Sequence, residues 1–314
     1  MSCHLLIVSH DELGVIFDGL ADPLHPAVAV DLSSTAKGLR TPLTVALQTL
    51  KQQHETVVAL CDKMETTCEE VRHADTLRWD RRGAASLLYG YRPERTLSAH
   101  EMGTLGQMLR TNGLPWLQSL WLLANAIGDA GLRSLCQGLE CGGAPSLSDL
   151  NLGGNQITPA GVASLAGPIG KGALRRLEKL NLGFNSLGKQ GMAMLAPLRQ
   201  LPLLHTLNLK GNEIGDEGVS ALLAELGKDD FKKLRELRLD DNELTSETCD
   251  TLICVVDSGA LPKIKGSWKI LTVDDNPAIS VGEQLMLHNR ILDRGRIPLS
   301  TERVVKSTNI GGAY

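Results

Sequence analysis

The stretch Leu204-His-Thr-Leu-Asn-Leu-Lys-Gly-Asn212-Glu-Ile214 reads L-x-x-L-x-L-x-x-N-x-I, and this frame decides the fold. It returns with its first leucine at Leu117, Leu147, Leu177 and Leu234. The asparagines stand at Asn125, Asn155, Asn185, Asn212 and Asn242, which are 30, 30, 27 and 30 residues apart. Self-similarity at such a period is the signature of a stacked repeat architecture.

Each unit predicts one short strand followed by one helix. The L-x-L segment alternates inward and outward as a strand does, and the asparagine amide is placed to satisfy backbone groups where the chain leaves the sheet. A helical leucine follows ten residues later, at Leu135, Leu165, Leu195, Leu222 and Leu252. A glycine six residues past the asparagine either lets neighbouring helices approach or serves the geometry of the helix start. A lone unit cannot bury its apolar face, so the units must stack.

The frame and its I-G-D-x-G continuation, at 127–131 and 214–218, resemble the ribonuclease-inhibitor class of leucine-rich repeats. The resemblance implies an α/β fold, a right-handed solenoid over residues 113–290. Its horseshoe would carry parallel strands on the concave face and helices on the convex face. Proteins of this class include inhibitors, nucleotide-sensor ectodomains and Ran GTPase-activating proteins, so the fold does not assign a function.

A divergent first repeat is expected at residues 76–112. Its strand is Leu77–Trp79, and its helix begins at a capping box formed by Ser98 and Glu101. The two halves are separated by an insertion at 80–95 that carries arginines and tyrosines. Such residues either stack on nucleic acid or form a solvated loop, and the acidic net charge favours the loop. A last, eroded copy keeps Trp268, Leu271, Val273 and Asn276.

Residues 42–75 carry an apolar heptad stripe from Leu43 to Val71. We expect one long helix that covers the apolar end of the first repeat and gives the solenoid an all-α N-terminal cap. The alternative is a dimerising coiled coil, but cysteine, methionine and histidine are weak choices for a zipper seam. The chain is therefore expected to be a monomer outside its complexes.

Residues 1–41 contain the pattern D-E-L-x-x-I-F-x-x-L-x-D-P from Asp11 to Pro23, which resembles an F-box. That resemblance implies an apolar face that docks on the Skp-type adaptor of cullin ubiquitin ligases. The residues that would carry the contact are Leu13, Ile16, Phe17, Leu20 and Pro23. The alternative is a structural cap over the heptad helix. The tail at 291–314 is expected to have little fixed structure.

Composition excludes several classes of function. With 42% apolar residues, a net charge of −4 and no apolar run near 20 residues, the chain is expected to be cytoplasmic, or else nuclear, and not to enter a membrane. The net charge argues against nucleic acid binding. Seven cysteines without a C-x-x-C pair predict reduced thiols and no zinc site. Because no catalytic, phosphate-binding or metal motif occurs, we expect no cofactor and no enzymatic activity.

Candidate binding residues follow from projecting the strands onto the concave face. Its central column is expected to contain Trp121, Asn151, Asn181, Asn208, Arg238 and Thr272. Trp121 is either an interface anchor or a residue that packs under the 80–95 insertion. At the other end, Asp240, Asp241, Asp274 and Asp275 are expected to form one patch. This patch would attract a basic partner, bridge a divalent cation, or be plain solvated acidity.

These observations predict a protein–protein interaction module that binds a client on its concave sheet. The F-box-like segment refines this to the substrate-recognition subunit of a cullin-type ubiquitin ligase. The alternative is a stand-alone scaffold or inhibitor whose N-terminal segment is purely structural. A GTPase-activating role is a remote alternative, because six or seven repeats give only a short arc.

Overall fold

The computed structural model describes residues 44–79, 96–111, 113–224, 226–227, 230–264 and 271–295. The F-box-like segment with Leu13, Ile16, Phe17, Leu20 and Pro23 lies outside the described residues. So do the 80–95 insertion and residues 296–314.

The strands form one parallel sheet in sequence order, which confirms the α/β repeat architecture predicted from the frame. Its members are β1 (Thr76–Arg78), β2 (Ser119–Trp121), β3 (Asp149–Asn151), β4 (Lys179–Asn181), β5 (Thr206–Asn208), β6 (Glu236–Arg238) and β7 (Leu271–Thr272). The leucine at the centre of each longer strand is buried, while its two neighbours face the other way. The curvature of a horseshoe stays a prediction.

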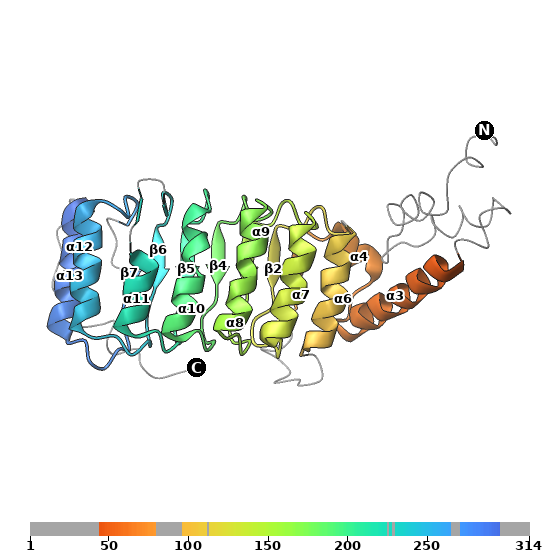
Figure 1. The fold of residues 1–314 in the computed structure, drawn as a ribbon, viewed down its shortest axis with the longest axis horizontal. Coiled ribbons are helices and arrows are strands. Elements are labelled where there is room, and N and C mark those ends of the chain that lie inside the picture. Colours follow the sequence, from red (N-terminus) through yellow and green to blue (C-terminus); the bar gives the residue numbers. More distant parts are fainter. Residues whose placement is uncertain are drawn as a thin grey trace.

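The helices form a second layer over one side of the sheet (Figure 1). They are α6 (Ala99–Arg110), α7 (Gly128–Glu140), α8 (Pro159–Val162), α9 (Ala166–Gly170), α10 (Gly188–Met194), α11 (Gly215–Leu223), α12 (Ser246–Ser258) and α13 (Val281–Gly295). Two short 3-10 helices, η4 (Ala163–Leu165) and η5 (Ala196–Gln200), complete the third and fourth units. The leucines predicted ten residues past each asparagine are all buried between the layers.

The asparagines form a ladder of hydrogen bonds along the edge of the core, as their predicted role requires. The Oδ1 of Asn155 accepts the backbone N–H of Asn125 at 3.0 Å, and the Oδ1 of Asn185 accepts that of Asn155 at 2.9 Å. Each Nδ2 donates to backbone carbonyls, as Asn212 does to Leu182 and Leu209. The ladder satisfies buried backbone groups that the turn leaves without sheet partners.

Packing explains the recurring glycines at 131, 161, 191 and 218, whereas a Cβ at Gly282 would meet only Ser280 Oγ, at 3.8 Å. A Cβ added at Gly218 would lie 2.5 Å from Cγ2 of Ile214 in its own helix and 3.1 Å from the Cα of Lys189 in the preceding helix. Positive φ occurs instead at the preceding Gly215, with φ 62°. Close approach therefore demands the absent side chain at the sixth position.

An aspartate in one unit holds the start of the next helix. Thr158 donates its backbone N–H and its hydroxyl to the Asp129 carboxylate, at 2.8 and 2.6 Å. Thr245 makes the same two bonds to Asp216, at 2.9 and 2.6 Å. Gly161 leaves room for this contact, because a Cβ there would lie 2.2 Å from Asp129 Oδ1. The units therefore interlock through side chains on the helix side as well as through the ladder.

The single long helix predicted for 42–75 is wrong. The segment forms α3 (Thr44–Lys63) and α4 (Cys68–His73), separated by a turn in which Glu65 has φ 53°. Thr67 and Glu70 make a capping box that starts α4, and this local hydrogen bonding outcompetes continuation of the heptad helix. Helix α3 contacts α6. Four apolar residues of the pair enter the core at its N-terminal end, namely Val57, Leu60, Cys61 and Val71.

Both terminal units contribute to the core. In the first, β1 pairs with β2, Leu77 and Trp79 are buried, and Ser98 caps α6 through Glu101. In the last, α13 runs to Gly295 with Ile291 buried, past the boundary expected at residue 290. Within the described ranges, no helix combines the length and apolarity that spanning a bilayer requires.

Candidate functional site

The sheet face, meaning the side of the sheet away from the helices, aligns the predicted column. The strand register makes Trp121, Asn151, Asn181, Asn208 and Arg238 successive Cα partners, and Arg238 then pairs with Thr272. Neighbouring strands in a sheet lie about 4.8 Å apart. The five side chains therefore form one row across β2 to β6.

At the N-terminal end of this row, Trp121 is half-buried. The guanidinium of Arg78 lies over its ring, with Cζ 4.7 Å from the centroid. The Trp121 indole N–H makes no hydrogen bond that meets geometric criteria within the described part of the chain. Burial raises the pKa of the neighbouring Asp149, while Lys179 and the Trp121 indole oppose that rise. The alternative that Trp121 packs under the insertion concerns residues outside the described ranges.

The central asparagines share one conformation. The Oδ1 of Asn151 accepts the backbone N–H of Gly153 at 3.1 Å, and the Oδ1 of Asn181 accepts that of Gly183 at 2.9 Å. Asn208 does the same with Lys210 at 3.0 Å. Such local turns are a common use of asparagine. They fix which side of each amide faces the backbone.

Phe184 is a feature that the strand projection missed. Its side chain is 57% exposed, although its backbone φ of 56° lies in a region that bulky residues rarely adopt. Its ring lies against Gly211, and the Lys210 Nζ lies 5.8 Å from the ring centroid. A sequence signal was available, because Gly154 and Gly211 occupy the equivalent slot. Ala124, Asp241 and Asp275 occupy the same slot, each with φ 57°, so the left-handed conformation belongs to the turn of the repeat.

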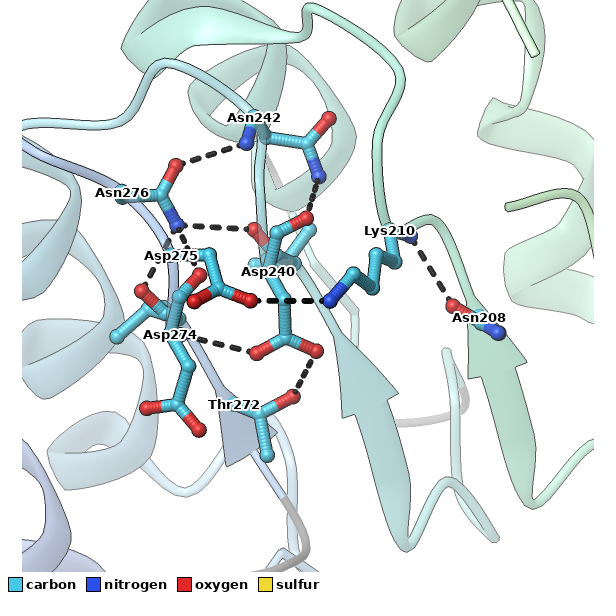
Figure 2. A network of polar contacts seen from close by, with 10 residues as sticks. Asn208, Lys210, Asp240, Asn242, Thr272, Asp274, Asp275 and Asn276 are labelled. Carbon is cyan, nitrogen blue, oxygen red and sulfur yellow. Dashed lines mark hydrogen bonds and ion pairs between the residues drawn. The ribbon is translucent and has the colours of Figure 1, made fainter. Parts of the chain in front are cut away.

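Three of the four aspartates predicted to form one patch, Asp240, Asp274 and Asp275, lie close together (Figure 2). Asp240 is buried, and its carboxylate accepts the Thr272 hydroxyl at 2.8 Å and the Asp274 backbone N–H at 2.9 Å. Asp275 forms an ion pair with Lys210 at 3.0 Å. Asp240 therefore serves to join β6 to β7. Binding of a basic partner or a cation at this patch stays a prediction.

Asp241 and Asp275 are exposed and have φ 57°. Aspartate tolerates this left-handed conformation better than most residues, which is one structural reason for finding it there. Burial and the Asp240 carboxylate raise the pKa of Asp274, and burial lowers the pKa of the nearby His288. No group of three or more metal-ligating side chains is assembled among the described residues.

The two ends of the predicted site are therefore separate. Trp121 lies on β2, whereas the aspartates follow β6 and β7, with three strands between. The structure aligns the central column, adds Phe184 to its rim, and gives Asp240 a structural partner. The row presents aromatic and amide groups, with ion pairs at its edge. Beside it on β5, the Thr206 hydroxyl lies 3.1 Å from His205 Nδ1, and His205 Nε2 lies 3.2 Å from Glu178 Oε2.

Comparison with known proteins supports the repeat. A family model described as a leucine-rich repeat matches residues 143–166, 174–196 and 200–223. No curated protein matches the chain. The solved structures that resemble it include the actin-binding site 2 of leiomodin-1, at 15% identity and a TM-score of 0.39, covering 52% of this chain and 87% of that one. They also include an internalin (InlF) of Listeria monocytogenes, at 15% identity and a TM-score of 0.27. That match covers 75% of this chain and 92% of the internalin chain. The chain therefore contains leucine-rich repeats, and domains built from them generally mediate protein–protein interaction.

Proposed function

We propose that this chain is a protein-interaction module rather than an enzyme, and that its client binds on the sheet face. The observation that carries the proposal is the in-register row from Trp121 to Arg238, whose side chains point away from the core. A rigid row on regular strands suits binding because its members are already ordered before the partner arrives.

Two aromatic side chains support a protein as the partner. Trp121 stands in the row, and Phe184 stands exposed on its rim at a strained backbone position. Large aromatic residues dominate the binding energy of many protein interfaces. Phe184 packs against Gly211 on one side, and we assign its exposed remainder to the client contact.

Charge reversal on the two faces tests the proposal. Lys179→Glu and Arg238→Glu change exposed cations on the sheet face, and Arg133→Glu makes the same change on the exposed side of α7. Partners captured by cross-linking and mass spectrometry should be lost from the first two variants and kept by the third. If all three variants capture the same partners as the unaltered chain, the client does not bind the sheet face.

A finer proposal is that the module is the substrate receptor of a cullin-type ubiquitin ligase. It rests on the F-box-like pattern at residues 11–23. The described cap residues that enter the core lie between Val57 and Val71, so removal of residues 1–41 is expected to leave the repeats folded. Phe17→Ala and Leu20→Ala should then abolish capture of a Skp-type adaptor without changing client capture. An adaptor that is never captured leaves the stand-alone scaffold or inhibitor.

A further inference from the structure

We propose that Cys61 and Cys68 are a redox-active pair that closes into a disulfide and fastens α4 to α3 at the N-terminal end of the repeats. The two sulfurs lie 3.9 Å apart, with the Cys68 thiol donating toward Cys61. Both cysteines are free thiols in the structure. This inference goes beyond the client contact on the sheet face, because it concerns the cap and needs no client.

The turn between the two helices brings the sulfurs together. A helix that continued from Cys61 to Cys68 would separate their Cα atoms by about 10.5 Å, whereas a disulfide joins Cα atoms about 4.4–6.8 Å apart. Instead, the N–H of Thr66 donates to the Cys61 carbonyl at 3.0 Å, and that of Glu65 donates to the Asp62 carbonyl at 3.1 Å. With Glu65 at φ 53°, these are the two bonds of a Schellman turn, which ends α3 and returns the chain toward it.

The two thiols differ in their access to solvent. Cys61 is 1% exposed and belongs to the core at this end of the molecule, whereas Cys68 is half-buried and can be reached by a reagent. Burial, together with the neighbouring Cys68 and Asp62, raises the pKa of the Cys61 thiol to about 12. Because the thiolate is the nucleophile in thiol chemistry, Cys68 reacts first and Cys61 second.

The oxidant is a low-molecular-weight disulfide of the glutathione class. The Cys68 thiolate attacks one sulfur of that disulfide, which forms a mixed disulfide and releases one glutathione thiolate. The Cys61 thiolate then attacks the Cys68 sulfur, and the second glutathione leaves as a thiolate. Two protein thiols are oxidised to one disulfide, one external disulfide is reduced to two thiols, and the two protons lost by the cysteines pass to the leaving thiolates. Excess reduced thiol reverses both steps.

The other described cysteines supply internal controls. Within the described ranges, no other two cysteine sulfurs lie in hydrogen-bond contact. Cys249 is buried and Cys254 is exposed, although both belong to α12. Five helical residues turn by about 140°, so these two thiols lie on different faces of one helix and cannot pair. Proximity is therefore a property of the α3–α4 turn and not of the number of cysteines.

A disulfide at this turn ties the cap to the first strand. Helix α4 ends at His73 and leads into β1, and the carbonyl of the intervening Asp75 accepts the N–H groups of Gln118 and Ser119. Helix α3 contacts α6 (Figure 1). A cross-link between Cys61 and Cys68 closes a short loop and limits how far α4 can open from α3. Oxidation therefore stiffens the connection between α3 and β1, and reduction frees it.

Titration of the full chain with oxidised glutathione, at a fixed concentration of reduced glutathione, tests the pair. The samples are quenched with acid, alkylated and digested with trypsin, which places Cys61 in peptide 52–63 and Cys68 in peptide 64–72. The two peptides should appear joined, and dithiothreitol should separate them. Because the second step is intramolecular, linkage should need about tenfold less oxidised glutathione than the mixed disulfide at exposed Cys254 needs. A mixed disulfide at Cys68 without linked peptide would overturn the proposal.

Serine variants test the order of the two steps. Cys68→Ser should leave Cys61 unmodified at the same concentrations of oxidised glutathione, because the buried thiol reacts only through Cys68. Cys61→Ser should stop at the mixed disulfide on Cys68. Cys254→Ser, which removes an exposed thiol from α12, should yield as much linked peptide as the unaltered chain does. Equal modification of Cys61 with and without Cys68 would refute the assigned roles.

Hydrogen exchange, followed by mass spectrometry, tests whether the disulfide fastens α4. The amides of residues 64–72 should exchange about tenfold more slowly in the oxidised chain than in the reduced chain, because the cross-link restricts local opening. The amides of α12 should exchange equally in both. Linked peptide with unchanged exchange at residues 64–72 would contradict the fastening. Neither measurement involves a client, so the proposed function is tested separately by the charge-reversal variants.

Discussion

Replacing Asn185 by alanine should destabilise the fold more than the same change at Asn155, although both are buried members of the ladder. Asn185 Oδ1 accepts two backbone N–H groups, from Asn155 at 2.9 Å and from Ile157 at 3.0 Å. Its Nδ2 donates to the Leu152 carbonyl at 3.1 Å. The alanine variant leaves three buried backbone groups without these partners.

Fewer backbone groups depend on Asn155 as their sole hydrogen-bond partner than depend on Asn185. Its Oδ1 accepts the Asn125 N–H at 3.0 Å. Its Nδ2 donates to the Leu122 carbonyl, which also accepts from Asn125 Nδ2, so that carbonyl stays satisfied in the variant. The alanine variant therefore leaves one buried N–H without a partner.

The free-energy difference follows from these counts. An unsatisfied buried donor or acceptor costs about 1–3 kcal/mol. Asn155→Ala should then lower the free energy of unfolding by about 1–3 kcal/mol, and Asn185→Ala by about 3–6 kcal/mol, because neighbouring backbone relaxes to recover part of the loss. The expected gap between the variants is about 2–3 kcal/mol.

Urea unfolding followed by far-UV circular dichroism measures the gap, with Asn289→Ala on the exposed surface of α13 as the control. Similar m-values are required for the comparison, since stacked repeats can unfold in parts. Hydrogen exchange at the Ile157 amide should quicken in Asn185→Ala and not in Asn155→Ala. Equal destabilisation, or a larger loss at Asn155, would refute the assignment of backbone satisfaction to the ladder.

Three further changes test the packing, the electrostatics and the strained rim. Gly161→Ala should cost about 1–3 kcal/mol by displacing the Asp129 carboxylate, whereas Gly103→Ala, in open space on α6, should be neutral or stabilising; thermal unfolding compares them. Burial opposes ionisation of Asp216, but hydrogen bonds from Thr245 and Thr248 outweigh it and lower its pKa. The ionised carboxylate thus stabilises the fold at pH values above its unfolded pKa of about 3.9, and this stabilisation is lost as the pH falls through its lower pKa in the folded state. Asp216→Asn should therefore make the free energy of unfolding depend less on pH in this acidic range. Phe184→Asn should raise stability by about 0.5–1 kcal/mol in urea unfolding while weakening client capture, and a loss of stability would contradict the strain.

Much of the fold could be predicted because its determinants recur within each unit. The spacing of Leu204, Leu207, Leu209 and Asn212 specifies the inward positions and the turn, and repetition of that spacing specifies the register. The position of each sheet-face side chain follows from the same alternation. The repeat frame alone therefore places Asn151, Asn181 and Asn208 in one row.

The direction of their amides is set locally, by a bond to the backbone N–H two residues on. The tertiary structure was needed for contacts between units, as for Lys210, which reaches Asp275 across 65 residues of chain. The partners of Asp240 could not be predicted for the same reason, since Thr272 and Asp274 belong to the next unit. The heptad stripe in the sequence continues through Glu65, but the chain turns there and the Thr67–Glu70 capping box starts a new helix.

The sequence by itself thus determined the strand-and-helix unit, its stacking and the composition of the sheet face, because periodic burial is a local property repeated along the chain. Only the tertiary structure decided which polar groups remain available to a partner. Hydrogen bonds and ion pairs between units consume some donors and acceptors and leave others, and that outcome depends on distances between side chains that are far apart in sequence. The ion pair between Lys210 and Asp275, and the bonds of Asp240 to Thr272 and Asp274, belong to this second group.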